Sequence, residues 1–167
     1  MPRLSDRVGT FTDSVIRRMT RINNQYDSIN LSQGFPDFDP PKELTDALAK
    51  AAHDGPHQYA VTFGAQNFRE ALAKKTSPAL HHEVDPNTEI CVTCGGTEAM
   101  MAAMMTICNP GDKVMVFSPF YENYGADAIL SGAEPIYIPL VPPEYEFDLS
   151  LIEKGFACLL YTSPSPR

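Results

Sequence analysis

The sequence predicts an α/β fold built on a parallel sheet. Between residues 89 and 140, three short apolar segments that suit β-strands alternate with two longer segments that suit helices. This order implies parallel strands joined by right-handed crossovers. Because ligands bind beyond the carboxyl ends of the strands in such sheets, we expect the functional site to follow the first two strands. The expected strands are 90–93, 113–117 and 135–139, and the expected helices are 97–108 and 121–130.

The first of these strands ends in a pair of glycines that opens the next helix. Gly95 and Gly96 follow the strand, and Thr97 begins a run of strong helix formers. The first N–H groups of a helix lack intrahelical partners and lie at the positive end of its dipole, so a phosphate fits there. A plain strand-to-helix turn has the same spacing. Since neither G-x-G-x-x-G nor G-x-x-x-x-G-K-[ST] is present, both interpretations stay open.

Two aromatic features are candidates for lining a pocket. Tyr121 follows the second strand, where its ring can stack on a planar ligand whose phosphate rests on the glycine turn, although a core or surface tyrosine is the more common case. Prolines and a glycine make the loop 33–41 irregular, and Phe35 and Phe38 give it apolar side chains to bury. Such a loop can line a pocket, but an anchored connector is the simpler interpretation.

Local signals predict the remaining elements. Helix 97–108 is apolar nearly all round, so we expect it to be buried on more than one side. Residues 109–112 place Pro and Gly at the central positions of a type II turn. Three further helices are expected upstream: an amphipathic one that Thr12 can cap and that carries Val15, Ile16, Met19 and Ile22 on one side, one bounded by Pro41 and Gly55, and one bounded by Gly64 and Pro78.

Composition and charge argue against several function classes. The chain of 167 residues has a formal net charge of −8, whereas nucleic acids and anionic membranes attract clustered Lys and Arg. No apolar run is long enough to span a bilayer, and the N-terminus lacks the apolar core of a signal peptide. We therefore expect a cytoplasmic protein with no nucleic-acid or membrane partner.

The cysteines and histidines predict neither a disulfide framework nor a metal site. Four cysteines without a secretory signal suit reduced thiols. Cys91 and Cys94 form a C-x-x-C, but Cys91 falls within the expected strand rather than at a helix start, which disfavours a redox role. His81 and His82 lie in a polar connection with no further ligand at metal-binding spacing, so no metal is expected.

Five segments of the chain form one larger pattern. Together they resemble the fold type I pyridoxal-phosphate enzymes, specifically the class I aminotransferases, over residues 10–155. The branch resembled includes the aspartate, aromatic, methionine and kynurenine/glutamine aminotransferases. Each motif is weak alone, but their order and spacing are specific. The motifs are 30–38 (NLSQGFPDF), Tyr59 with Gly64 and 68–72, 92–99 (VTCGGTEA), 109–112, and 118–124 (SPFYENY).

The resemblance implies a cofactor, pyridoxal 5'-phosphate, and residues that bind it. Gly96 and Thr97, with Gly95 beside them, would hold the cofactor phosphate through backbone N–H groups. Tyr121 would stack on the pyridine ring. Tyr59 would reach across a homodimer interface to the phosphate of the neighbouring subunit's cofactor.

The resemblance also implies a substrate site and a reaction. Gly34 would offer its backbone N–H to the substrate α-carboxylate, with Phe35 nearby in the side-chain pocket. The parent enzyme would transfer an amino group from an amino acid to a 2-oxo acid by a ping-pong mechanism. The alternatives are a carbon–sulfur β-lyase of the same fold and a non-catalytic fragment that keeps only the phosphate cradle.

Other parts of the family's machinery are expected beyond the end of this chain. The lysine that forms a Schiff base with the cofactor, the aspartate at its ring nitrogen and the arginine that binds the carboxylate have no counterpart here. Lys113 cannot replace that lysine, because it is predicted at the opposite edge of the sheet. We therefore expect no catalytic residue within the chain and no turnover by it alone.

The resemblance implies a division of the chain into three parts. Residues 1–40 would form an N-terminal helix and arm belonging to a small domain. Residues 41–155 would form the first part of a large cofactor-binding domain, a three-layer α/β/α structure with a mostly parallel sheet, truncated here. The segment 156–167 departs from the family, and its Ser and Pro content suits a disordered tail.

Overall fold

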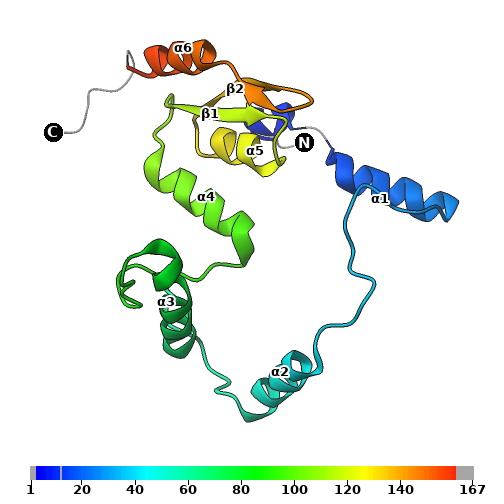
Figure 1. The fold of residues 1–167 in the computed structure, drawn as a ribbon, viewed down its shortest axis with the longest axis vertical. Helices are drawn as coiled ribbons and strands as arrows, with labels where there is room; N and C mark the ends of the chain where they lie inside the picture. The colour runs from blue at the N-terminus through cyan, green and yellow to red at the C-terminus, as the bar shows by residue number, and fades with distance from the viewer. Residues whose placement is uncertain (1–2, 12, 161–167) are drawn as a thin grey trace. The chain divides into compact units, whose positions relative to one another are not determined.

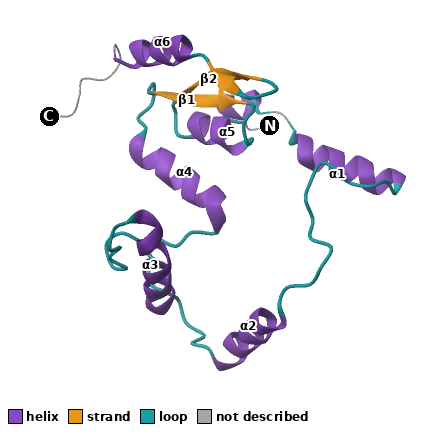
Figure 2. Ribbon diagram, in the orientation of Figure 1, coloured by secondary structure: helices purple, strands orange, loops and turns teal. Residues whose placement is uncertain are grey.

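The computed structural model describes residues 3–11 and 13–160 of the chain. These fall into two compact units, one of Asp13–Val92 and one that combines Met1–Thr12 with Thr93–Arg167. Figure 1 labels the elements along the chain, and Figure 2 separates helices from strands. The first unit consists of helices α1 to α3 with their connections, and the second unit contains the sheet.

The sheet contains the parallel pair that the sequence predicts. Strands β1 and β2 run parallel, with Lys113 opposite Glu134 at one end and Ser118 opposite Pro139 at the other. The type II turn before β1 is confirmed, since Gly111 has a φ of +91°. A short β3 adds an antiparallel edge to β2. The elements of this unit are η1 (Asp6–Thr10), α4 (Gly95–Ile107), β1 (Lys113–Ser118), α5 (Asn123–Leu130), β2 (Glu134–Val141), β3 (Glu146–Phe147) and α6 (Leu149–Leu160). Helix α6 extends into the segment 156–167 that is predicted as a disordered tail, and residues 161–167 of that segment lie outside the described residues.

Helices α5 and α6 cover opposite faces of this sheet, which gives the expected three layers (Figure 1). On one face, Gly125 of α5 lies so close to Tyr137 that an added Cβ would be 2.7 Å from the tyrosine oxygen. On the other face, a Cβ on Gly155 of α6 would be 2.5 Å from the end of Met115. Glycines at these two points let the helix backbones approach the strands closely. The buried apolar residues of the unit are Val116, Ala128, Ala133 and Ile138.

One charged side chain is buried with α5. Asp127 is 5% exposed, and its Oδ2 has no hydrogen-bond partner among the described residues. Because burial penalises the charged form, the pKa of the Asp127 carboxyl is raised above its ordinary value. Burying this group costs free energy, so α5 is held in place by its apolar contacts with the sheet rather than by Asp127.

The predicted strand at residues 90–93 is wrong. This segment is irregular, and none of its residues pairs with the sheet. Instead, the Val92 amide donates to the Phe63 carbonyl oxygen at 3.0 Å, and the Val92 side chain lies against Gly64. A β-branched sequence forms a strand only where a neighbouring backbone pairs with it, and here the partner is a single residue of a loop.

The helix predicted at 97–108 forms as α4, but the expectation that it is buried on more than one side is wrong. Met105 is 63% exposed and Ile107 is 72% exposed. Among the described elements, α5 is the one that packs against α4 along several residues. An apolar sequence can be buried only where other elements cover it, and α5 covers one side.

The first unit contains the three helices predicted upstream. The Ser14 side chain caps the first of them by accepting from the Arg17 amide, and the predicted cap Thr12 lies outside the described residues. Helix α1 spans Val15–Tyr26, α2 spans Lys42–Asp54 and α3 spans Gln66–Leu80. Gly55 ends α2 with a φ of +77°, as predicted, whereas α3 continues past Pro78 and ends at His81, which has a φ of +49°. The loop before α2 is irregular, as predicted, but Phe35 and Phe38 are exposed rather than buried.

A buried arginine connects α3 to the loops on either side of it. Arg69 is 6% exposed, and its guanidinium donates to the carbonyl oxygens of Gly64 and Pro86 and to the side chain of Gln66. These acceptors satisfy the buried charge, which would otherwise be costly. Arg69 therefore fixes the path of the chain as it enters and leaves this region.

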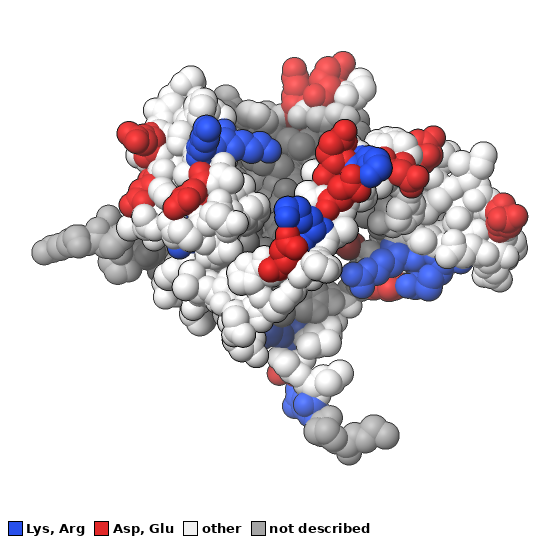
Figure 3. All heavy atoms as spheres, turned by 90° about the horizontal axis from the view of Figure 1, so that it is seen from below, with Lys and Arg blue, Asp and Glu red and all other residues white. Residues whose placement is uncertain are grey.

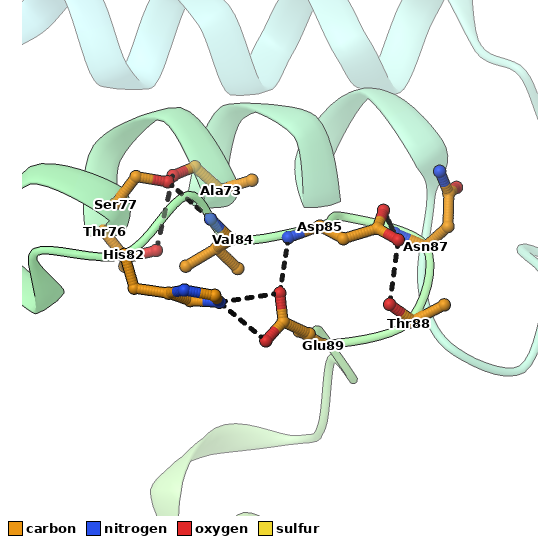
Figure 4. Close-up of polar contacts among 9 residues, drawn as sticks. All are labelled: Ala73, Thr76, Ser77, His82, Val84, Asp85, Asn87, Thr88 and Glu89. Atoms are coloured by element: carbon orange, nitrogen blue, oxygen red, sulfur yellow. Dashed lines mark hydrogen bonds and ion pairs between the residues drawn. The ribbon is translucent and has the colours of Figure 1, made fainter.

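A polar network closes the connection between α3 and residue 90 (Figure 4). His82 Nε2 lies 2.9 Å from Glu89 Oε1, and the Asp85 amide donates to the other Glu89 oxygen at 2.7 Å. The Asp85 carboxylate in turn accepts from the Asn87 amide and the Thr88 hydroxyl. These hydrogen bonds hold the pKa values of the Glu89 and Asp85 carboxyls below their ordinary range.

The unfolding free energy should therefore fall in acid. Because the folded pKa of Glu89 lies below its ordinary value of 4.5, the unfolded chain binds more protons, and stability is lost as the pH falls through the folded pKa. We expect Glu89→Gln to be less stable than wild type near neutral pH and to lose less stability in acid. Urea unfolding measured at several pH values below about 6, the range in which carboxyl groups titrate, checks this prediction.

The control for this experiment is Glu83→Gln. Glu83 is an exposed carboxylate in the same connection, and no side-chain hydrogen bond involves it among the described residues. Its substitution should leave the pH dependence unchanged. Equal acid sensitivity in wild type and Glu89→Gln would mean that the network does not contribute.

Acidic and basic side chains are interspersed on the face drawn in Figure 3. The ion pairs of α2 are exposed, and they join Lys42 to Asp46 and Lys50 to Asp54, one helical turn apart. Such exposed pairs contribute little to stability. The helices that the structure describes are too short or too polar to span a bilayer.

Candidate functional site

The glycine turn before α4 is shaped by its own polar groups. The Thr93 hydroxyl donates to the Gly95 carbonyl oxygen at 3.0 Å, and the Gly95 amide donates back to the Thr93 carbonyl oxygen at 2.8 Å. Gly95 has a φ of +82°, a conformation that favours glycine. The turn therefore depends on Thr93 and Gly95.

Two backbone amides at the start of α4 remain unpaired. The Glu98 carboxylate folds back and accepts from the Cys94 amide, so that amide is satisfied. The following amides, those of Gly96 and Thr97, have no acceptor among the described residues, as expected in the first turn of a helix. They lie at the positive end of the helix dipole.

The space beside these amides is open. A Cβ built on Gly95 or Gly96 would meet no atom within 4 Å. An anion can therefore approach the unpaired N–H groups without displacing any described side chain. The residues present fit a phosphate group, which needs several donors and no bulky neighbour.

The start of α5 is tied to the start of α4. Asn123, the first residue of α5, donates from its Nδ2 to the Thr97 hydroxyl oxygen at 2.9 Å. Asn123 follows the carboxyl end of β1, whereas the segment before Thr97 is irregular and lies outside the sheet. This hydrogen bond brings the glycine turn together with the segment after β1.

Tyr121 belongs to that same segment. Its ring is 53% exposed and meets the Tyr124 ring edge-on, with 6.2 Å between centroids. The neighbouring Phe120 stacks instead on Tyr137 of β2, with centroids 5.0 Å apart and nearly parallel rings. Phe120 thus anchors the segment to the sheet, while the Tyr121 ring stays accessible two residues before Asn123.

The other predicted site residues lie in the first unit. Gly34 and Phe35 belong to the irregular loop before α2, and a Cβ on Gly34 would meet nothing within 4 Å. Phe35 is 62% exposed and the Tyr59 side chain is fully exposed. The structure brings together Gly95, Gly96, Thr97 and the Tyr121 segment, while Gly34, Phe35 and Tyr59 stay predictions as site residues.

Lys113 holds the position expected of it, whereas Cys91 lies in an irregular segment rather than in the predicted strand. Lys113 begins β1, at the end of the strand opposite to Ser118 and the Tyr121 segment. Cys91, Cys94 and Cys108 are free thiols, and burial raises the pKa of the Cys108 thiol. In the part of the chain that the structure describes, no three His, Cys, Asp or Glu side chains gather to hold a metal ion.

Comparison with known proteins identifies the family. The family model described as aminotransferase class I and II matches residues 26–165, which is most of the chain. The chain belongs to the class I and II aminotransferase family. A relative among curated proteins is the methionine aminotransferase of Escherichia coli, which is 37% identical over 92% of this chain and 41% of its own length.

A second curated relative and two solved structures agree with this membership. The probable N-succinyldiaminopimelate aminotransferase of Mycobacterium tuberculosis is 34% identical over 86% of this chain and 36% of its own length. An E. coli structure with a methionine aminotransferase function superposes with a TM-score of 0.83 and 35% identity, covering 95% of this chain and 41% of that one. The M. tuberculosis N-succinyldiaminopimelate aminotransferase structure gives a TM-score of 0.83 and 30% identity, covering 92% and 40%.

The match confirms the fold class and shows how much of its relatives' length the chain covers. The fold is that of the type I aminotransferases. The part present in this chain is a small mixed sheet with a helix on each face. The chain spans 41% of the length of the E. coli relative and 36% of the M. tuberculosis one.

Three residues of this site were not given a role from the sequence. Asn123, Glu98 and Thr93 each form a hydrogen bond that shapes or connects the turn. An acidic residue in the first turn of a helix is a local signal that identifies Glu98 as a capping residue. No local signal pairs Asn123 with Thr97, because the contact joins residues from two helices.

The two glycines should respond oppositely to alanine. Gly95→Ala should lower the free energy of unfolding by about 1–2 kcal/mol, because its positive φ strains a residue with a Cβ. Gly96→Ala should leave stability unchanged or raise it by up to about 1 kcal/mol, because the position is helical and open. Urea unfolding of both variants checks this, and equal losses would contradict the described turn.

Proposed function

We propose that this chain carries the phosphate cradle of a pyridoxal-phosphate-dependent aminotransferase. The observation that carries the proposal is the pair of unpaired amides of Gly96 and Thr97, with open space beside them, in a chain of the aminotransferase family. These donors fit a phosphate dianion, and the family membership makes the phosphate of pyridoxal 5'-phosphate the candidate ligand. The relatives' names favour an aminotransferase over a β-lyase.

Each cradle residue has a distinct task in this proposal. The amides of Gly96 and Thr97 would donate to the phosphate, and Gly95 would keep the approach clear. The exposed Tyr121 ring would stack on the pyridine ring. When bound, the cofactor supplies the electron sink and carries the amino group between the amino acid and the 2-oxo acid. The chain's own contribution is to bind and orient it.

The proposal assigns the first unit to the substrate and to a second subunit. The Gly34 amide would bind the substrate α-carboxylate, with Phe35 beside the substrate side chain. The full exposure of Tyr59 suits a side chain that contacts the cofactor phosphate of a partner in a homodimer. The small-domain role of residues 1–40, the cofactor-domain role of 41–155 and a cytoplasmic location belong to the same proposal.

The proposal assigns the chemistry to residues outside this chain. We infer that Lys113 does not form the covalent link to the cofactor, because it begins β1, away from the Tyr121 segment. The chain alone would therefore bind the cofactor without turnover. The amino acid and 2-oxo acid substrates, and the dimer, would belong to a longer parent enzyme.

Calorimetric titration of the purified chain tests the cradle. Pyridoxamine phosphate is the best probe, because it lacks an aldehyde and does not label lysines. We expect it to bind, inorganic phosphate to compete with it, and pyridoxamine without the phosphate to bind at least about tenfold more weakly, since charge-assisted hydrogen bonds are lost. Gly96→Ala should weaken binding by a similar factor, because its methyl group occupies space beside the amides.

The control is Ser131→Ala at the far end of α5. The Ser131 hydroxyl donates to the Asp127 carbonyl oxygen at 2.7 Å and takes no part in the cradle. This variant should bind like wild type. Equal binding of the phosphorylated and unphosphorylated compounds would contradict the proposal, as would stoichiometric borohydride labelling of one lysine by pyridoxal phosphate, which would place the covalent link within this chain.

A further inference from the structure

We propose that Asn123 is a positioning residue that directs the Thr97 hydroxyl proton at the bound phosphate. The inference rests on the proposed function, since it assumes that the start of α4 binds a phosphate. The inference adds the Thr97 hydroxyl as a side-chain donor beside the backbone amides of Gly96 and Thr97. Asn123, which lies on α5, would orient that hydroxyl.

The hydrogen bond between the two side chains has a definite direction. The Asn123 amide nitrogen donates to the Thr97 oxygen at 2.9 Å. A threonine hydroxyl has one proton and two acceptor lone pairs. With Asn123 donating to one lone pair, the Thr97 proton is left to be donated to another acceptor.

Thr97 differs in this respect from the other threonines in the helices. A helical threonine normally donates to a carbonyl oxygen in the preceding turn. Thr20, Thr45, Thr76 and Thr106 all do so, at distances of 2.7–3.0 Å. The Thr97 hydroxyl makes no such bond among the described residues, because it lies in the first turn of α4.

The position of Asn123 is fixed by the sheet. Asn123 follows Phe120, whose ring stacks on Tyr137, and it precedes Gly125, which lies against the same tyrosine. Ala128 of the same helix is fully buried. The donor is thus held by a rigid element, so the Thr97 hydroxyl is preorganised before a ligand arrives.

The inference makes a specific prediction for ligands with and without a phosphate. Asn123 acts on the ligand only through Thr97. Removing the Asn123 side chain should therefore weaken the contact with the phosphate and leave the contacts with the rest of the ligand unchanged. Asn123→Ala should therefore bind pyridoxamine phosphate about tenfold more weakly than wild type, as for one charge-assisted hydrogen bond, with little change for pyridoxamine.

A double-mutant cycle with Thr97→Val separates this role from a general one. If Asn123 works through the Thr97 hydroxyl, the double variant Asn123→Ala/Thr97→Val should bind no more weakly than Thr97→Val alone. Thr97→Ser keeps the hydroxyl, so it should bind like wild type and remain sensitive to Asn123→Ala. Additive losses in the cycle, or no loss in Asn123→Ala, would overturn the inference.

Folding and the cradle itself are checked in the same experiment. Ser131→Ala removes another side-chain hydrogen bond of α5 and should not alter binding. Urea unfolding of every variant distinguishes a local effect from a loss of structure, and the cycle is evaluated with Thr97→Ala, which also removes the hydroxyl, if Thr97→Val is unfolded. If the wild-type chain does not prefer pyridoxamine phosphate over pyridoxamine, the cradle and this inference are both overturned. If the wild-type chain shows that preference and Asn123→Ala binds pyridoxamine phosphate equally well, this inference alone is overturned.

Discussion

The amides of Gly96 and Thr97 are unpaired because they lie in the first turn of α4, where no described carbonyl oxygen accepts from them. Thr93 and Gly95 bond to each other, and Glu98 satisfies the Cys94 amide. What remains is a pair of donors at the positive end of a helix, with no side chain in front of them. The rest of this unit serves to hold that arrangement in place. The parallel strands anchor α5, and Asn123 at the start of α5 holds Thr97.

Elements defined by local chemistry could be predicted from the sequence. Gly55 ends α2, Gly111 completes the type II turn, and the β1–β2 pair runs parallel, since a single helix joins the two strands. Residues 90–93 were predicted wrongly, because a strand requires a neighbouring backbone and the sequence does not reveal which neighbour is available. The burial of α4 was predicted wrongly for the same kind of reason, as apolar residues are buried only where another element covers them.

In the candidate site too, features set by local sequence could be predicted, whereas contacts between distant residues could not. The glycines and the hydroxyl at 95–97 follow from a local pattern, so the proposed cradle could be suggested from the sequence. Its hydrogen bond from Asn123 could not be predicted, because that contact joins residues 26 positions apart. Large apolar side chains also stay exposed on both units, including Leu48, Tyr59 and Met105. Exposed apolar surface favours association, and the chain spans 41% of the length of its E. coli relative.

The measurement that tests the central claim most directly is a ¹⁵N–¹H NMR titration of the labelled chain with pyridoxamine phosphate. It reports which backbone amides meet the phosphate, residue by residue. We expect the largest shifts at Gly96 and Thr97, and we expect inorganic phosphate alone to reproduce them. Shifts centred on the exposed arginines of α1, Arg17, Arg18 and Arg21, with Gly96 and Thr97 unmoved, would contradict the account.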